Sequence, residues 1–61
     1  MEWTGFTLTI NTENDAFKTN PEIEMTVLLQ DVIDRINDGH VQDLCVDSNG
    51  NVVGRWKFTS N

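Results

Sequence analysis

The chain has 61 residues, ten of them acidic and four basic, so its formal net charge at pH 7 is −6. A chain of this length forms a single domain, residues 1–61, and folding buries only about 60% of the surface of the unfolded chain, which makes a monomer marginally stable. The negative charge opposes binding to the backbone of DNA or RNA, because cationic side chains recognise that backbone.

The stretch FTLTIN predicts the first strand, because its apolar and polar residues alternate strictly. Phe6, Leu8 and Ile10 point to one side of an extended chain. Thr7 and Thr9 point to the other side, which is typical of a strand with one buried face. The next stretch, NTENDAFKTN, is rich in Asn, Asp and Thr and is predicted to be a loop.

The strongest signal in the chain predicts a helix from Pro21 to Asp38. Asn20 is a suitable N-cap, proline is favoured at the first helical position, and Gly39 can end the helix. Apolar residues recur at helical spacing and form one stripe, which consists of Met25, Leu28, Leu29, Val32 and Ile36, with Ile33 on its flank. Ile23 and Val27 lie on the other side, either as tolerated exposed groups or as a second contact surface for a partner subunit.

The stretch SNGN predicts a hairpin turn, and two registers of the strands around it are possible. A two-residue turn would pair Val46 with Val53 and mix charged and apolar residues on one face. A three-residue loop pairs Val46 with Val52 and separates the charged residues from the apolar ones, so we favour it. In that register the core face carries Leu44, Val46, Val52, Trp56 and Phe58, and the opposite face carries Cys45, Arg55 and Lys57.

The order of these elements predicts an α+β fold of the β-α-β-β type. The helix brings the chain back, so the first two strands run in the same direction and the third lies antiparallel between them. The result is a three-stranded antiparallel sheet in the order 1-3-2 with one helix packed on one face. Its outer strands leave open edges, and small domains are commonly stabilised by assembly, so we expect a homodimer or a higher oligomer.

No arrangement of residues predicts catalysis, a metal site or a cofactor. DSNGNV begins like a calcium loop, but Val52 and Phe58 stand where such a loop needs glycine and glutamate. Cys45 and His40 are the only cysteine and the only histidine, which argues against a Cys/His metal cluster. We interpret the carboxylates of the helix as a solvated surface, because no two of them form a catalytic pair. We therefore expect a protein that is not an enzyme.

The chain also lacks the pattern of a membrane protein. No apolar run exceeds three residues, as in VLL, whereas a membrane-spanning helix needs about 20. A single cysteine and the absence of a signal-peptide pattern are typical of a reducing cytoplasm. We expect a cytoplasmic protein with neither a membrane nor a nucleic acid as its partner.

The loop stretch NDAF is the first candidate binding site. Asn14 and Asp15 offer hydrogen bonds to a ligand. Phe17 either stacks on a flat ligand or anchors the loop to the core.

The stretch GRWK is the second candidate binding site. Gly54 lets another backbone or a ligand approach closely. Arg55 points away from the helix, where it can bind a phosphate or a carboxylate in a bidentate way. Trp56 either belongs to the core or contributes an aromatic surface to the ligand.

Four stretches, FTLTINTENDAF, NPEIE, DGH and DSNGNVVGRWKF, resemble the pattern of very small proteins encoded by tailed phages and prophages. That pattern consists of a first strand, an N-x-A-F loop, a helix that begins at proline and a D-x-N-G-N-x-V-G hairpin. The resemblance covers residues 6–58, and the leading MEWTG lies outside it. The helix of this chain is acidic, whereas the helix of the family is more basic.

The resemblance implies a non-enzymatic phage accessory protein that counters host defence in the host cytoplasm. It implies a homo-oligomer that sequesters a small nucleotide-derived immune signal. Arg55 would contact the phosphate, Phe17 or Trp56 would stack on the base, and Asn14 and Asp15 would bond to the ribose or the base edges. The alternative is an acidic inhibitor that binds a basic host protein, or an accessory protein with a structural or regulatory role.

Overall fold

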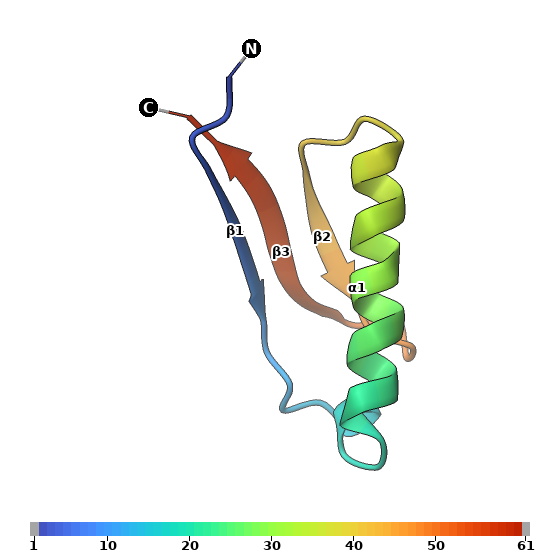
Figure 1. Ribbon diagram of the computed structural model, residues 1–61. Coiled ribbons are helices and arrows are strands. Elements are labelled where there is room, and N and C mark those ends of the chain that lie inside the picture. The colour runs from blue at the N-terminus through green and yellow to red at the C-terminus, as the bar shows by residue number, and fades with distance from the viewer. Residues whose placement is uncertain (1, 61) are drawn as a thin grey trace.

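The computed structural model describes residues 2–60 and contains one helix packed against one sheet (Figure 1). The elements in chain order are β1 (Gly5–Ile10), the 3-10 helix η1 (Asp15–Phe17), α1 (Pro21–Asn37), β2 (Gln42–Val46) and β3 (Val52–Thr59). The strands form one antiparallel sheet in the order β1-β3-β2. The predicted α+β fold and its β-α-β-β arrangement are therefore confirmed. Within residues 2–60, α1 is too short and too polar to cross a membrane.

The ends of α1 follow from the residues that flank it. The helix begins at Pro21, as predicted, although the side chain of Asn20 makes no capping hydrogen bond. It ends at Asn37, one residue before the predicted end. Gly39 then adopts a φ of 94°, and its N–H donates to the carbonyl oxygen of Ile36 at 3.0 Å. This is the left-handed glycine termination that the sequence predicts.

The hairpin combines the two registers that the sequence allows. Val46 pairs with Val52, as predicted, but the next pair joins Cys45 to Gly54, so Val53 is an extra residue in β3. Such a β-bulge shifts the pairing by one residue and turns the following side chains of the partner strand to the other face. Leu44 consequently pairs with Arg55, as in the register that the hydrophobic pattern disfavours.

The bulge makes part of the predicted core face wrong. Leu44, Val46 and Val52 were expected in the core, but they are 51%, 48% and 60% exposed. Cys45 was expected to face away from the helix, but it is buried against it. The predictions for Trp56, which is buried, and for Arg55 on the opposite face hold.

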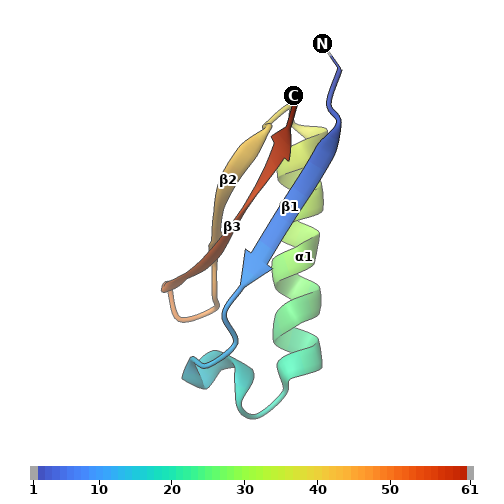
Figure 2. The same ribbon diagram turned by 90° about the vertical axis from the view of Figure 1, so that its left-hand side faces the viewer.

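The core lies between α1, the inner face of the sheet and η1. Its buried residues are Phe17, Leu28, Val32, Cys45, Val53 and Trp56, and Ile10, Ala16, Met25, Ile36 and Phe58 pack against them. The expected loop after β1 contains η1, which lies beyond the end of the sheet beside the first turns of α1 (Figure 2). This position brings Phe17 into the core.

Candidate functional site

The face of the sheet that points away from α1, here called the open face, consists of two cross-strand rows and a pair next to the turn. The rows are Thr7–Lys57–Gln42 and Thr9–Arg55–Leu44, and the pair is Val46–Val52. All of these residues are exposed. Because α1 packs on the other face, a ligand on the open face can contact all three strands.

The open face carries the two basic side chains of residues 2–60 that form no ion pair. Lys18 lies 3.3 Å from Asp15, and Arg35 pairs with two other carboxylates. Arg55 and Lys57 have no carboxylate partner within residues 2–60. The nearest acidic residue along the sheet, Asp43, borders the same depression, but its carboxylate bonds to Arg35 on the helix side. The two cations without an ion pair therefore lie on the open face, whereas Lys18 and Arg35 lie elsewhere beside carboxylates.

Two shallow depressions meet at the centre of the open face. One has a volume of about 420 Å³ and is lined by Gln42, Asp43, Leu44, Arg55, Trp56 and Lys57. The other has a volume of about 330 Å³ and is lined by Asn11, Asn14, Leu44, Val52, Val53, Gly54 and Arg55. Arg55 and Leu44 line both. These volumes lie at the lower end of the range for small-molecule sites.

The structure brings only some of the five predicted ligand-binding residues together, because Asn14 lines one depression with Arg55 and Trp56 borders the other, whereas Asp15 and Phe17 line neither. Phe17 and Trp56 are buried in the core, so neither presents a ring to a ligand. The indole N–H of Trp56 has no acceptor among the described residues. Asn14 donates its side-chain N–H to Asp47 at 3.1 Å, and Asp15 pairs with Lys18 on the exposed side of η1.

Asp47 organises the hairpin turn and links it to η1. Its buried carboxylate accepts backbone N–H bonds from Asn49 at 2.9 Å and Asn51 at 2.8 Å, besides the bond from Asn14. These donors, the backbone N–H of Asn51 foremost, hold the pKa of Asp47 below its usual value. The sequence signal for this residue was present, because Asp before a turn commonly accepts from the backbone two residues on. Asn14 therefore has a structural role.

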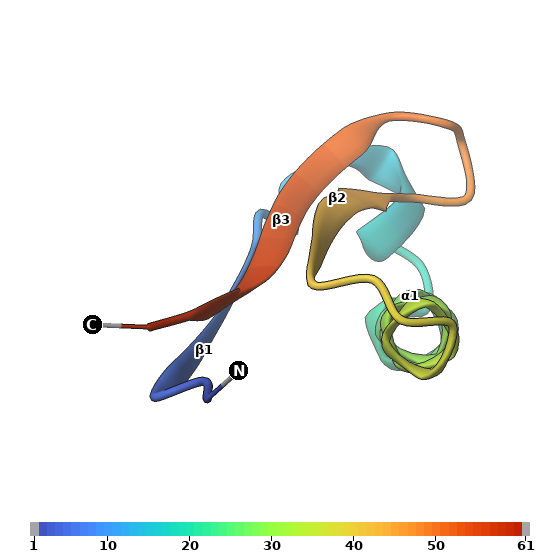
Figure 3. The same ribbon diagram turned by 90° about the horizontal axis from the view of Figure 1, so that it is seen from above.

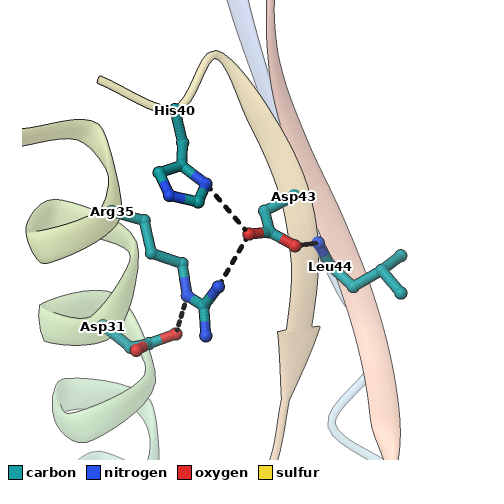
Figure 4. Close-up of polar contacts among 5 residues, drawn as sticks. All are labelled: Asp31, Arg35, His40, Asp43 and Leu44. Atoms are coloured by element: carbon teal, nitrogen blue, oxygen red, sulfur yellow. Dashed lines mark hydrogen bonds and ion pairs between the residues drawn. The ribbon is translucent and has the colours of Figure 1, made fainter. Parts of the chain in front are cut away.

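A second polar network links α1 to β2 (Figure 4). Arg35 donates from Nε to Asp31 at 2.9 Å and from Nη1 to Asp43 at 2.7 Å. Hydrogen bonds to Asp31 and then to Asp43 raise the pKa of Arg35. The backbone N–H of Leu44, followed by Arg35, lowers the pKa of Asp43, and His40 Nδ1 lies 3.4 Å from the same carboxylate. Arg35 is therefore occupied and cannot supply charge to the open face.

Within residues 2–60, the thiol of Cys45 is buried. Burial raises the pKa of the Cys45 thiol, which keeps it protonated and unreactive at neutral pH. No group of three potential metal-ligating side chains occurs in this part of the chain.

The outer face of α1 is an acidic surface with two exposed aliphatic residues. Ile23 and Val27, one helical turn apart, are each more than half exposed. A shallow depression beside them is lined by Thr26, Val27, Gln30, Asp31 and Asp34. The surface thus combines an apolar centre with carboxylates around it.

No protein-family model matches the chain, and no curated protein or solved structure shows significant similarity to it. The fold defines a small β-α-β-β protein, and the resemblance to phage-encoded proteins stays a prediction. The open face defines the candidate site by its own chemistry. Sequence reasoning placed Arg55 and Lys57 on this face but did not select Lys57 as a site residue. It also overlooked Trp3, which stacks on Phe58 with ring centroids 5.8 Å apart.

Proposed function

We propose that this chain is a non-enzymatic binding protein that takes a small, phosphate-bearing ligand of the nucleotide-derived kind on its open face. The observation that supports this function is the position of Arg55 and Lys57, the two basic side chains without an ion pair in residues 2–60, on a face where the neighbouring Asp43 carboxylate is already bonded to Arg35. Sequestration of a host immune signal is the biological role that the resemblance to phage proteins suggests.

The spacing of the two cations suits a ligand with more than one phosphoryl oxygen. Arg55 and Lys57 are two residues apart on β3, which separates their Cα atoms by about 7 Å on the same face. The guanidinium of Arg55 can bind a phosphate in a bidentate way, and the ammonium of Lys57 adds a second charge. Leu44, opposite Arg55 on β2, supplies an exposed apolar surface beside the phosphate site.

This arrangement differs from an aromatic nucleotide site. Phe17 and Trp56 are both buried, so a base would rest on Leu44 and Val52 instead of on an aromatic ring. Thr9 and Gln42 flank Arg55 and Lys57 with hydrogen-bonding groups. We therefore expect recognition to depend more on the phosphate than on the identity of the base.

Isothermal titration with a panel of cyclic dinucleotides and ADP-ribose derivatives tests this function. For a panel member that binds, we expect Arg55→Ala to weaken binding at least about tenfold, because it removes a charge-assisted hydrogen bond. Lys57→Ala should weaken binding several-fold. Lys18→Ala is the matched control, because it removes the same charge as Lys57→Ala but lies away from the open face. The proposal fails if no panel member produces heat, or if Lys18→Ala weakens binding as much as Arg55→Ala.

The outer face of α1 supports a second candidate function, the binding of a basic protein partner. Exposed apolar residues surrounded by charge are typical of protein-binding surfaces, and Ile23 and Val27 are among the most exposed apolar residues described. The carboxylates of Glu22, Asp31 and Asp34 would attract a basic partner and steer its approach. This face lies on the opposite side of the molecule from the open face.

An affinity pull-down from host lysate at low and high salt checks the second candidate. We expect a basic protein to be retained at low salt and released as salt screens the carboxylates. A variant with Ile23→Glu and Val27→Glu should lose this protein, whereas the Val52→Glu control on the open face should keep it. Equal retention by both variants would assign the interaction to another surface.

A further inference from the structure

The inner face of β1 is apolar but uncovered. Phe6 and Leu8 pair with Phe58 and Trp56, so their side chains point to the same side of the sheet as α1. They are nevertheless 43% and 37% exposed. The reason is the position of α1, which lies beside β2 and not beneath β1 (Figure 3). Trp3, 39% exposed, extends this surface beyond the start of the strand.

The helix presents a second apolar surface towards the same side. Its polar flank faces β2 and the hairpin turn, where Arg35 bonds to Asp43 and Glu24 accepts two bonds from Ser48. The other flank, here called the apolar flank, consists of Met25, Leu29, Ile33 and Ile36. Met25 and Ile36 pack partly against the core, but Ile33 is 49% exposed. The apolar flank and the inner face of β1 are therefore both partly exposed. They face the same side of the molecule, where α1 does not cover the sheet.

The outer edge of β1 is unpaired and has none of the features that prevent edge pairing. The strand GFTLTI contains no charged residue and no proline, and its pairing with β3 is regular from Gly5 to Ile10. The Asn11 N–H donates to the carbonyl oxygen of Val53 at 2.7 Å, so residue 11 directs its backbone groups towards β3. Backbone direction alternates in antiparallel pairs, so the N–H groups of Phe6 and Leu8 point to the free edge.

We propose that a second copy of this chain covers these surfaces by pairing its β1 antiparallel to β1 across a twofold axis. The pairing makes a six-stranded sheet with both helices on one face. The uncovered inner faces of the two β1 strands then lie side by side between the two apolar flanks. In this contact the same surfaces of the two copies meet. The free edges of the two β1 strands pair, and the apolar surfaces pack against each other, as an isologous contact requires.

The charge of the molecule favours a second copy over a different partner. The chain carries a net charge of −6, and two copies repel each other least where they meet through uncharged residues. Trp3, Phe6, Leu8 and Ile33 are all uncharged, so this surface has nothing to attract a charged partner. Whole aromatic side chains bury about 150–250 Å² each, so the exposed parts of Trp3 and Phe6 alone leave on the order of 150 Å² bare. A twofold contact doubles this area and adds two strand edges.

Sedimentation velocity over a range of protein concentrations tests the proposal, with circular dichroism to confirm that each variant is folded. We expect the wild type to be a dimer at micromolar concentrations. Leu8→Lys buries an unpaired charge in the contact and should raise the dimer dissociation constant at least about 100-fold. Val46→Lys is the matched control, because it also adds a lysine at an exposed aliphatic strand position, but on the open face. It should leave the dimer intact.

Amide hydrogen exchange identifies the surface that pairs. In a dimer joined through β1, the amides of Phe6 and Leu8 should become protected as concentration rises. In the Leu8→Lys variant, the Phe6 amide should exchange quickly at every concentration. A wild type that stays monomeric at about 100 µM overturns the proposal. A dimer in which the Phe6 and Leu8 amides exchange freely, or which only Val46→Lys dissociates, overturns it as well, because the contact then lies elsewhere.

Discussion

Replacement of Gly54 by alanine should leave much of the protein unfolded at 25 °C. A Cβ atom at this position would overlap the carbonyl oxygen of Thr9 and lie 3.0 Å from the Cα atom of Ile10. Both atoms belong to the backbone of β1, so no side-chain rotation can relieve the overlap. Overpacking of this kind costs about 3 kcal/mol or more, and a chain of this size rarely has more than about 3–5 kcal/mol of stability. Urea unfolding followed by tryptophan fluorescence measures the loss.

Gly39→Ala is the matched control for this substitution. Gly39 also has an unusual environment, with a φ of 94°, but no atom lies within 4 Å of an added Cβ. The expected cost is that of a left-handed alanine, about 1–2 kcal/mol. If the two variants proved equally stable, β1 would not pack against Gly54 as closely as the structure indicates.

The close approach of the β1 backbone to Gly54 also shows which role this glycine has in the stretch GRWK. The sequence predicts that Gly54 admits either another backbone or a ligand. The backbone of β1 occupies that space, so the glycine serves the sheet. The ligand hypothesis for this stretch therefore depends on Arg55, together with Lys57 two residues further on.

The order of the elements could be predicted because each has a strong local signal. The alternation in FTLTIN, the Asn20-Pro21 start of the helix and the glycine at residue 39 depend on neighbouring residues alone. The antiparallel order then follows from the short connections between the elements. Local chemistry thus accounts for β1, α1 and the hairpin.

For β3 beyond the bulge, the sequence correctly predicts which side chains face the core. For β2 it does not. Side chains alternate along one strand whatever its partner does, so Arg55 and Lys57 lie opposite Trp56 in any register. The face of Leu44 depends on pairing between strands, which the extra residue Val53 shifts. A hydrophobic pattern does not reveal such a bulge, because VV followed by glycine fits both a regular strand and a bulged one.

The roles of Asn14 and Phe17 depend on contacts between distant parts of the chain. Asn14 bonds to Asp47, which lies in the hairpin turn, and Phe17 meets the core only because η1 turns towards α1. No local pattern distinguishes such a structural asparagine from one that binds a ligand. The sequence therefore places candidate-site residues correctly only on β3, where the alternation of side chains along a single strand fixes the face on which they lie.

The proposed dimer and the proposed ligand site are compatible. Pairing through the outer edge of β1 uses its inner face and leaves the open face exposed. The open faces of two copies would then form one continuous surface that carries Arg55 and Lys57 twice, related by the twofold axis. Such a surface would suit a ligand that has twofold symmetry and two phosphates.

Replacement of Asp47 by asparagine should lower the melting temperature at pH 7 by roughly 5–10 °C in a domain of this size. The carboxylate accepts from the backbone of Asn49 and Asn51 and from the side chain of Asn14. An amide has a single acceptor oxygen, and its NH₂ group would face these donors. The variant therefore weakens the side-chain hydrogen bonds that support the hairpin turn and link it to η1, while the backbone hydrogen bonds of the turn remain. Thermal unfolding followed by circular dichroism gives the shift.

The pH dependence of the melting temperature distinguishes the contribution of the charge of Asp47 from that of its shape. The native pKa lies below the ordinary 3.8, so the stabilisation by the carboxylate is complete well above that value and is lost as pH falls through the native pKa. The difference in melting temperature between wild type and Asp47→Asn should thus be constant from pH 7 to about pH 5 and shrink below about pH 4. Asp34→Asn, at an exposed position on α1, is the control and should change the melting temperature little at any pH. A difference that stayed constant down to pH 2 would show that the turn does not depend on the ionised carboxylate.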